Sequence, residues 1–391
     1  MSPLHVLLIS GEYPPMEGGV ADFTRILAEH MVEKGACVHV LTSTRAAPRE
    51  TGADTHRLRV HPTISSWGWR PLYGGLRRLL GEHDIDVVNI QYQTAAYGMH
   101  PAVNLLPRLF PGLPFVVTFH DLLVPYLFPR AGPLRWWVNA ELAHSSEAVI
   151  VTNEEDRARL ASDERVSHLV TIPIGSNVPY HLPENYDRDG WRRHLGLPRT
   201  ALVLCYFGFL NASKGGEELI EALTILREKG RDACLLMIGG GVGASDPTNQ
   251  AYLERIESVV RARNLDEYVV WTGYVSPSQV SASFASADIC VLPYRDGVSF
   301  RRGSLMAALV HGMPIVSTHP QVELPDLEHG ENIWLIPPRD PQALAEAVAH
   351  LADDLERMER LGRRARVLAR RFDWKQIAAR TLEVYGHVIA G

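Results

Sequence analysis

The sequence predicts an α/β protein built from two doubly wound, parallel-sheet domains. Its 391 residues are too many for one ordinary hydrophobic core. In each half, short apolar runs alternate with amphipathic stretches of about 10–15 residues, which is typical of parallel strands joined by helices. Around residues 178–190 the composition changes to Pro, Gly, Asn and charged residues, as in a linker. We therefore expect domains at 1–182 and 183–372.

In each half, predicted strands alternate with predicted helices. In the first half, apolar runs predict strands at 4–10, 37–43, 58–63, 86–92, 114–121 and 148–153. Helical periodicity predicts helices at 22–35, 72–83 and about 134–146, and Gly35 is the expected C-cap of the first. In the second half, strands are expected at 201–208, 233–241, 268–275, 288–294, 314–318 and 332–338. Helices are expected at 217–230, 251–264, 276–287, from about 303, and from about 341 onward.

Composition and charge argue against several classes of protein. The chain is 46% hydrophobic and 21% charged, as in globular proteins, and its net charge of -6 argues against nucleic acid as a partner. No apolar run reaches the ~18 residues that a membrane span needs, and the N-terminus lacks a signal peptide's basic region. The four cysteines lie in apolar runs and are expected to be buried and reduced. These features together predict a cytoplasmic protein.

The stretch 293–318 is the strongest candidate site. An apolar strand leads into a loop with Asp296, Arg301 and Arg302, and a helix begins at about Gly303 and Ser304. Helix N-termini carry unpaired N–H groups that attract anions, and arginine pairs well with phosphate. We interpret the loop, with Ser299 and Phe300, as a site for the diphosphate of a nucleotide sugar; two solvated arginines are the simpler reading.

Three further positions fit such a site. Gly18 and Gly19 lie between a strand and a helix, where backbone N–H groups can approach a ligand closely. His120 ends an apolar strand, where an imidazole can bind a sugar hydroxyl or transfer a proton. Lys214 precedes a helix and adds positive charge to an anion site. A glycine needed only for a turn, a surface histidine and a solvated lysine are the alternatives.

Other motifs were weighed and set aside. The run 236–243 is a poor dinucleotide fingerprint, and the D-x-D string at 84–86 leads directly into a strand. No His/Cys spacing fits a metal site, so no metal and no cofactor are expected. The Trp- and Arg-containing segments 67–80 and 128–142 suit peripheral membrane contact at the inner face, and equally suit buried helix faces with snorkelling arginines.

Taken together, the motifs resemble the GT-B glycosyltransferases of family 4, which transfer a sugar from a nucleotide donor with retention of configuration. The likeness covers nearly the whole chain and rests on YPPMEGGV, TFHD, IPIGSNV, FGFLNASKGG, WTGYVSPSQV and the stretch 288–318. It implies that Gly19 lies beside the phosphates or acceptor, that His120 contacts the transferred sugar and that Lys214 binds the diphosphate. It places the backbone of Tyr274 and Val275 at the base, and a terminal helix, 373–391, back on the first domain.

The chain departs from the family pattern at three positions. An arginine usual in the family is Phe209 here, and its two glutamates, eight residues apart, are Asp296 and Ser304. Asp296 can still contact sugar hydroxyls, whereas Ser304 offers ribose only a weaker hydrogen bond. We expect Arg301 and Arg302 to replace the charge of the missing arginine.

The resulting expectation is a metal-independent hexosyltransferase. Its donor would be a UDP- or GDP-sugar, and its acceptor a hydroxyl of a sugar, a lipid-linked sugar or a small molecule, in polysaccharide, glycolipid or glycoconjugate synthesis. Fixed cations would stabilise the charge on the departing diphosphate. Two alternatives remain open: a GT-B relative with non-glycosidic chemistry, such as a sugar-nucleotide epimerase or a pseudo-glycosyltransferase, and a catalytically degenerate sugar-nucleotide-binding subunit.

Overall fold

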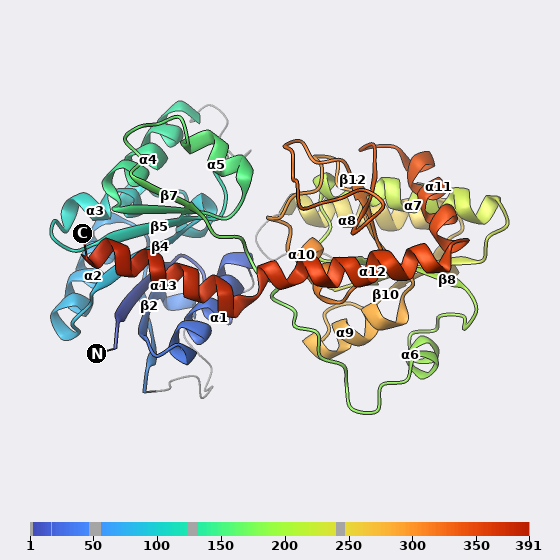
Figure 1. The fold of residues 1–391 in the computed structure, drawn as a ribbon, viewed down its shortest axis with the longest axis horizontal. Helices are drawn as coiled ribbons and strands as arrows, with labels where there is room; N and C mark the ends of the chain where they lie inside the picture. Colours follow the sequence, from blue (N-terminus) through green and yellow to red (C-terminus); the bar gives the residue numbers. More distant parts are fainter. Residues whose placement is uncertain (1–2, 17, 47–55, 123–131, 240–246, 391) are drawn as a thin grey trace. The chain divides into compact units, whose positions relative to one another are not determined.

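A computed structural model describes residues 3–16, 18–46, 56–122, 132–239 and 247–390. Within them the chain forms two compact units (Figure 1). Unit 1 comprises residues 1–175 and 374–391, and unit 2 comprises 176–373. The first sequence-based boundary, at 182/183, lies seven residues after the division at 175/176, and the second, at 372/373, lies one residue before the division at 373/374.

Unit 1 is a doubly wound parallel sheet with strand order β3-β2-β1-β4-β5-β6-β7. Its strands are β1 (His5–Ser10), β2 (Cys37–Ser43), β3 (Leu58–Ile64), β4 (Val87–Tyr92), β5 (Phe115–Phe119), β6 (Ala148–Val151) and β7 (His168–Thr171). Its helices are α1 (Gly19–Glu33), α2 (Trp69–Glu82), α3 (Leu106–Leu109), α4 (Gly132–Ser145), α5 (Glu154–Leu160) and α13 (Trp374–Ala390), with the 3-10 helix η3 (Pro101–Leu105) before α3.

The two faces of this sheet carry separate hydrophobic cores. One core joins β-strand residues such as Leu7 and Ile90 to Leu72 and Leu76 of α2. The other contains side chains of α1 and of the C-terminal helix, which lies along the sheet in Figure 1. Tyr385 of α13 is fully buried in it. The last helix of the chain is therefore an integral part of unit 1, as expected.

Unit 2 is a second doubly wound parallel sheet, with strand order β10-β9-β8-β11-β12-β13. Its strands are β8 (Leu202–Phe207), β9 (Ala233–Ile238), β10 (Val269–Trp271), β11 (Ile289–Leu292), β12 (Ile315–Thr318) and β13 (Trp334–Ile336). Its helices are α6 (Arg188–His194), α7 (Gly216–Glu228), α8 (Pro247–Ala262), α9 (Pro277–Ser286), α10 (Gly303–Val310), α11 (Pro341–Ala352) and α12 (Leu355–Ala369). Helices α7, α8 and α11 pack together on one face, and α10 packs with α12 on the other (Figure 1).

Several local expectations are confirmed and several are not. Gly35 has φ 96° immediately after α1, as a C-terminal glycine should. The strand expected at 268–275 ends at Trp271, and the helix expected from 341 is broken into α11, α12 and α13. Helix α5 and strand β7 were not predicted. Three cysteines are buried and all four are free, whereas Cys37 is only partly buried.

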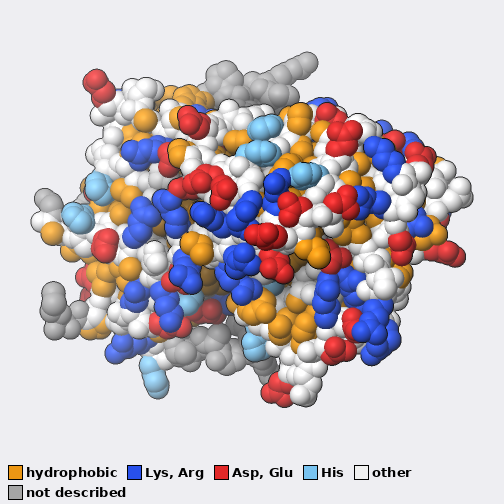
Figure 2. Space-filling model, turned by 45° about the vertical axis from the view of Figure 1, so that its right-hand side comes forward, with side chains coloured by type: hydrophobic (Ala, Val, Ile, Leu, Met, Phe, Trp, Pro, Cys, Tyr) orange, Lys and Arg blue, Asp and Glu red, His pale blue; other side chains and the backbone are white. Residues whose placement is uncertain are grey.

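The surface carries mixed charge. On the face shown in Figure 2, Lys and Arg side chains are interspersed with Asp and Glu, and hydrophobic side chains gather only in small groups. Within the described residues, no helix is both long and apolar enough to span a membrane.

Candidate functional site

The candidate donor site of unit 2 lies where its sheet reverses its winding direction. Strands β8 and β11 are neighbours in the sheet but are far apart in the sequence. In open α/β sheets, ligands bind at the carboxyl ends of the strands at such a switch point. Lys214 follows β8, and the loop 293–302 follows β11. The fold therefore brings the two predicted anion-binding segments to one edge of the sheet.

Backbone contacts fix these two loops to each other. The amide N–H of Arg295 donates to the carbonyl of Ser213 at 2.9 Å. The Arg295 guanidinium binds Glu217 and, at 2.7 Å, Glu218, both in the first turn of α7. Arg295 therefore holds the loops together, a role that sequence inspection did not identify.

Gly215 is the tightest point of this junction, and a substitution there tests it. Its φ of +72° favours glycine, and a methyl group would lie 1.9 Å from the carbonyl oxygen of Pro293. At the other end of α7, Gly230 has φ +80° and open space around it. Gly230→Ala should cost about 1–2 kcal/mol of unfolding free energy through backbone strain alone. Gly215→Ala should cost at least ~1 kcal/mol more, because the backbone must also move.

Urea unfolding of both variants measures this difference. Equal losses for the two glycines would show that the contact with Pro293 relaxes without cost. Donor binding should weaken only in Gly215→Ala, since Lys214 is its neighbour.

Four charged side chains gather between the two loops. Arg302 forms a close ion pair with Asp296, and Arg301 lies 3.8 Å from the same carboxylate. The Tyr294 ring lies between two cations, with Lys214 Nζ 5.3 Å and the Arg302 guanidinium carbon 4.9 Å from its centroid. Three cations and one carboxylate leave a net charge of +2 when Lys214 is protonated. This charge is equal in size and opposite in sign to that of a diphosphate diester.

The side chain of Lys214 titrates near neutral pH. Burial and the positive charges of Arg302 and Arg301, opposed by Asp296, together lower its pKa to about 7. A bound anion would reverse these effects and favour the ammonium form. Lys214 can thus bind an anion, and its protonation is coupled to that binding.

Two polar atoms of this cluster are buried without a hydrogen-bond partner among the described residues. They are Nε of Arg302 and Oδ1 of Asp296. Buried polar groups are almost always paired, so each indicates a place where a ligand or water completes the site. A donor N–H and an acceptor oxygen side by side suit a phosphate and a sugar hydroxyl, respectively.

Helix α10 begins immediately beside this cluster. Arg302 is its N-cap residue and provides no side-chain cap, so the first N–H groups of the helix keep the anion-binding character of a helix N-terminus. Gly303 is its first residue. Ser299 is buried and accepts hydrogen bonds from the N–H groups of Arg301 and Arg302, which shapes the turn into the helix. The hydroxyl of Ser304 is 2.6 Å from that of Tyr294.

The remaining predicted positions of unit 2 are less engaged. Phe300 packs its ring against Phe372 at 4.8 Å, as an ordinary hydrophobic contact. Tyr274 is 82% exposed in the loop after β10, with Val275 partly buried beside it. Both lie at the same sheet edge as Lys214. Phe209, at the position of the family's arginine, is 41% exposed.

In unit 1, His120 is held by a chain of buried amides. Its Nε2 is 2.9 Å from Oε1 of Gln91, and Nε2 of Gln91 donates to Oδ1 of Asn89 at 2.9 Å. Asn89 in turn donates to the hydroxyl of Tyr385 at 2.7 Å. With the Gln91 amide fixed in this way, His120 donates from Nε2 and presents Nδ1 as an acceptor.

This environment keeps His120 neutral. Burial lowers its pKa to about 3, and its ring packs edge to face with that of Phe23, with the ring centres 4.6 Å apart. A hydrogen bond from a sugar hydroxyl suits such an imidazole better than proton transfer at neutral pH. Asn89 and Gln91 were not predicted, although two polar residues two positions apart in an apolar strand were a visible signal.

Gly18 and Gly19 lie at the start of α1. A side chain at Gly18 would come within 2.2 Å of a Glu12 carboxylate oxygen, whereas space is open at Gly19. A side chain at Gly18 would displace the flexible Glu12 side chain, and Gly19 leaves the first turn of α1 open to a ligand. Burial raises the pKa of Glu12.

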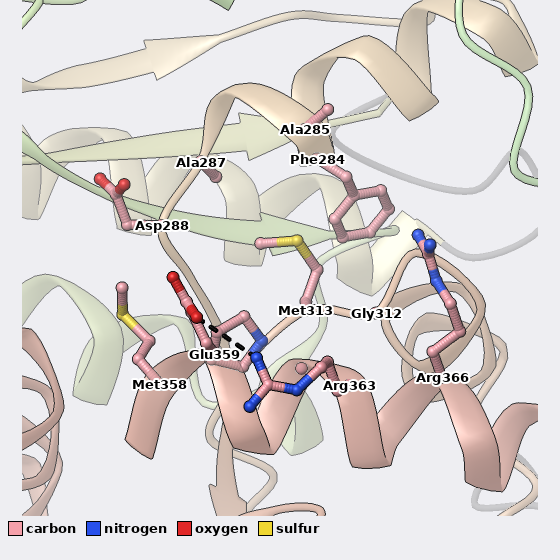
Figure 3. A pocket seen from close by; sticks show the side chains of 12 residues that line it. Phe284, Ala285, Ala287, Asp288, Gly312, Met313, Met358, Glu359, Arg363 and Arg366 are labelled. Carbon is pink, nitrogen blue, oxygen red and sulfur yellow. Dashed lines mark hydrogen bonds and ion pairs between the residues drawn. The ribbon is translucent and has the colours of Figure 1, made fainter. Parts of the chain in front are cut away.

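A separate pocket of unit 2 contains none of the predicted residues. It lies between α9 and α12, has a volume of about 370 Å³, and is drawn in Figure 3. Phe284 and Met313 form its apolar wall, and Arg363 on its rim pairs with Glu359 at 3.2 Å.

Comparison with known proteins assigns the family. The family model described as "Glycosyl transferase 4-like domain" matches residues 18–175, and the one described as "Glycosyl transferases group 1" matches 201–354. A GDP-mannose-dependent alpha-(1-6)-phosphatidylinositol monomannoside mannosyltransferase of Mycobacterium tuberculosis is 24% identical over 96% of both chains.

Solved structures show the same fold. Sucrose-phosphate synthase from Thermosynechococcus elongatus superposes with a TM-score of 0.77, 21% identity and 99% coverage of both chains. Anabaena Alr3699/HepE in complex with UDP and glucose superposes with a TM-score of 0.76 and 19% identity, over 98% of this chain and 100% of that one. With two doubly wound units and matches to both domain models, the chain belongs to the glycosyltransferases of the GT-B fold.

Proposed function

We propose that this glycosyltransferase takes its sugar from a nucleoside-diphosphate donor whose diphosphate binds between the loops after β8 and β11. The observation that carries the proposal is the cluster of Lys214, Arg301, Arg302 and Asp296 beside the start of α10. Its net charge of +2 and its buried, unpartnered Arg302 Nε match a diphosphate. The relatives named for GDP-mannose and the neighbour bound to UDP support the same class of donor.

The chemistry follows from the charge that develops on the leaving group. Breaking the bond between the anomeric carbon and the phosphate oxygen leaves extra negative charge on the diphosphate. Lys214, the two arginines and the N-terminus of α10 are fixed where they can stabilise this charge. Asp296 would hold a sugar hydroxyl through its unpartnered Oδ1. In unit 1, Nδ1 of His120 is an acceptor suited to a sugar hydroxyl. We propose departure and attack on the same face, with retention, and no metal in this step.

The acceptor is proposed to be a hydroxyl of a lipid-linked sugar or polyol. The mycobacterial relative is named for phosphatidylinositol monomannoside. In unit 1, exposed aromatic side chains stand on helices that pack around η3: Trp69 and Tyr73 on α2, and Trp136 and Trp137 on α4. Such residues suit the interfacial region of a membrane. Residues 128–131 of the segment predicted to contact a membrane lie outside the described residues.

A donor screen with product analysis tests the function. Isothermal titration with GDP-mannose and UDP-glucose should show one of them binding at micromolar Kd. Incubation of the labelled donor with phosphatidylinositol vesicles should then move label into the lipid, with unchanged rate after EDTA treatment, and sedimentation of the protein with those vesicles reports membrane contact.

Each outcome of this screen distinguishes one possible function from the others. Conversion of the donor without an acceptor indicates the epimerase class, and tight binding without turnover indicates a degenerate subunit. If neither these donors nor other common sugar nucleotides bind, the proposed donor site is wrong.

A further inference from the structure

Three histidines come together in unit 1, away from the residues discussed so far. His39 lies on β2, His61 on the edge strand β3, and His83 caps the C-terminus of α2. Within the described residues, they form a group whose nitrogen ligand atoms all lie within 4.8 Å of one another. They are spaced 22 positions apart along the chain, so no local spacing motif could predict the cluster.

The geometry is close to that of a three-histidine metal centre. Nδ1 of His39 and Nε2 of His61 are 3.0 Å apart. Tetrahedral zinc with Zn–N bonds of about 2.0–2.1 Å holds its ligand nitrogens about 3.3 Å apart. The ring of His83 lies 4.4 Å from that of His39 and 5.4 Å from that of His61, centre to centre. The separations at His83, which reach at most 4.8 Å, would shorten by up to about 1.5 Å to complete the site.

His39 is in the charge state that a metal requires. Burial and the neighbouring histidines His83 and His61 lower the pKa of His39 to about 4, so it is neutral at physiological pH. Two further groups, Arg59 and His5, lower it in the same direction. In the metal-free cluster one ring N–H donates to the other ring. A metal needs a lone pair from each of these two rings. The N–H proton of the donating ring therefore moves to that ring's second nitrogen when the metal binds.

We propose that His39, His61 and His83 bind a transition-metal ion, with zinc as the fitting case, and leave its fourth position to water. Three imidazoles with an open position form a set that zinc, copper and nickel prefer over magnesium or calcium. His83 also lines a surface cavity of about 410 Å³, with Asp84 beside it. This cavity gives an ion and its water a route from solvent.

The place of the cluster in the fold indicates a structural rather than a catalytic role. Helix α2 runs back from the carboxyl edge of the sheet, so His83 at its end lies toward the amino edge. His120, in contrast, lies at the carboxyl end of β5. A metal at the cluster would join edge strand β3 to β2 and α2, and would stabilise unit 1 independently of sugar transfer.

Metal titration of the chelator-treated full-length protein tests the proposal. Calorimetry with zinc chloride should show one equivalent bound with micromolar Kd, and cobalt(II) should give the intense visible absorption of a tetrahedral site. Hundredfold zinc over Kd should raise the melting temperature by about 5–10 °C. His61→Gln and His83→Gln, at partly buried positions, should weaken zinc binding at least tenfold each.

A matched histidine provides the control. His56 lies just before β3 and is exposed outside the cluster; His56→Gln should bind zinc like the wild type. The metal-free melting curve of each variant shows whether it folds. If the wild type takes up no zinc or cobalt, or if folded His61→Gln and His83→Gln bind as tightly as the wild type, the assignment is overturned.

Discussion

Lys214→Met is expected to lower kcat/KM for the nucleotide-sugar donor by about a thousandfold, or ~4 kcal/mol of transition-state stabilisation. The change removes a charge aimed at the diphosphate and keeps the length of the side chain. It also leaves Arg301 and Arg302 partly neutralised by Asp296. The loss should fall on both kcat and KM, since the diphosphate gains charge as the bond breaks. Steady-state kinetics with the donor from the binding screen measures it.

A second lysine, at the far end of helix α7, supplies the control. Lys229 is the exposed C-cap residue of α7, so Lys229→Met removes equal charge from unit 2 without touching the site. Its kinetics should match the wild type within about twofold, because exposed charges are largely screened. Similar losses in both variants would mean that overall charge, rather than Lys214, governs donor binding.

The pH dependence of donor binding gives Lys214 an independent signature. With its pKa lowered to about 7 in the free protein, Lys214 is protonated below that pH and loses its charge above it. The Kd for an intact nucleotide sugar should therefore rise with pH above about 7, approaching tenfold per unit. The diphosphate diester has no ionisation of its own there. Lys214→Arg keeps its charge and should flatten the profile; an equally steep profile in that variant would assign the titration elsewhere.

The fold could be predicted from the sequence because its strands are buried on both faces. Near-continuous apolar runs such as 201–208 and 288–292 are typical of central parallel strands, and the spacing between them leaves room for a helix. The elements that were missed are short. Strand β7 is a four-residue edge strand, and α5 has seven residues with three acidic ones in its first turn, so neither has an apolar period that distinguishes it from a loop.

The candidate site was predicted in its parts but not in its connections. Lys214, Arg301 and Arg302 are recognisable because each is a cation beside a helix start. Arg295 joins the loops through a contact that spans 77 positions of the sequence. The neutralisation of two arginines by Asp296 depends on side-chain rotamers within one loop. The amide chain behind His120 ends at Tyr385, 296 positions from Asn89. Such long-range contacts have no sequence period to reveal them.

Arg302→Ala is expected to weaken donor binding by about a hundredfold. Arg302 is the more buried member of the arginine pair, it carries the unpartnered Nε, and it is the closer partner of Asp296. Its removal deletes a phosphate contact and exposes a phosphate to the Asp296 carboxylate. Arg301→Ala should cost less, since Arg301 lies farther from Asp296 and leaves the Arg302 contact in place. Unchanged donor affinity in both single variants would reject the role of the pair.

A double-mutant cycle separates these two contributions. In Arg302→Ala/Asp296→Ala the repelling carboxylate is gone, so donor diphosphate affinity should recover about tenfold relative to Arg302→Ala. Turnover should not recover, because Asp296 is proposed to hold the sugar. The surface pair of Arg231 and Asp353 provides the control, and its single and double variants should leave the donor Kd unchanged. Additive losses at Arg302 and Asp296 would instead show that the ion pair does not tune the charge presented to the diphosphate.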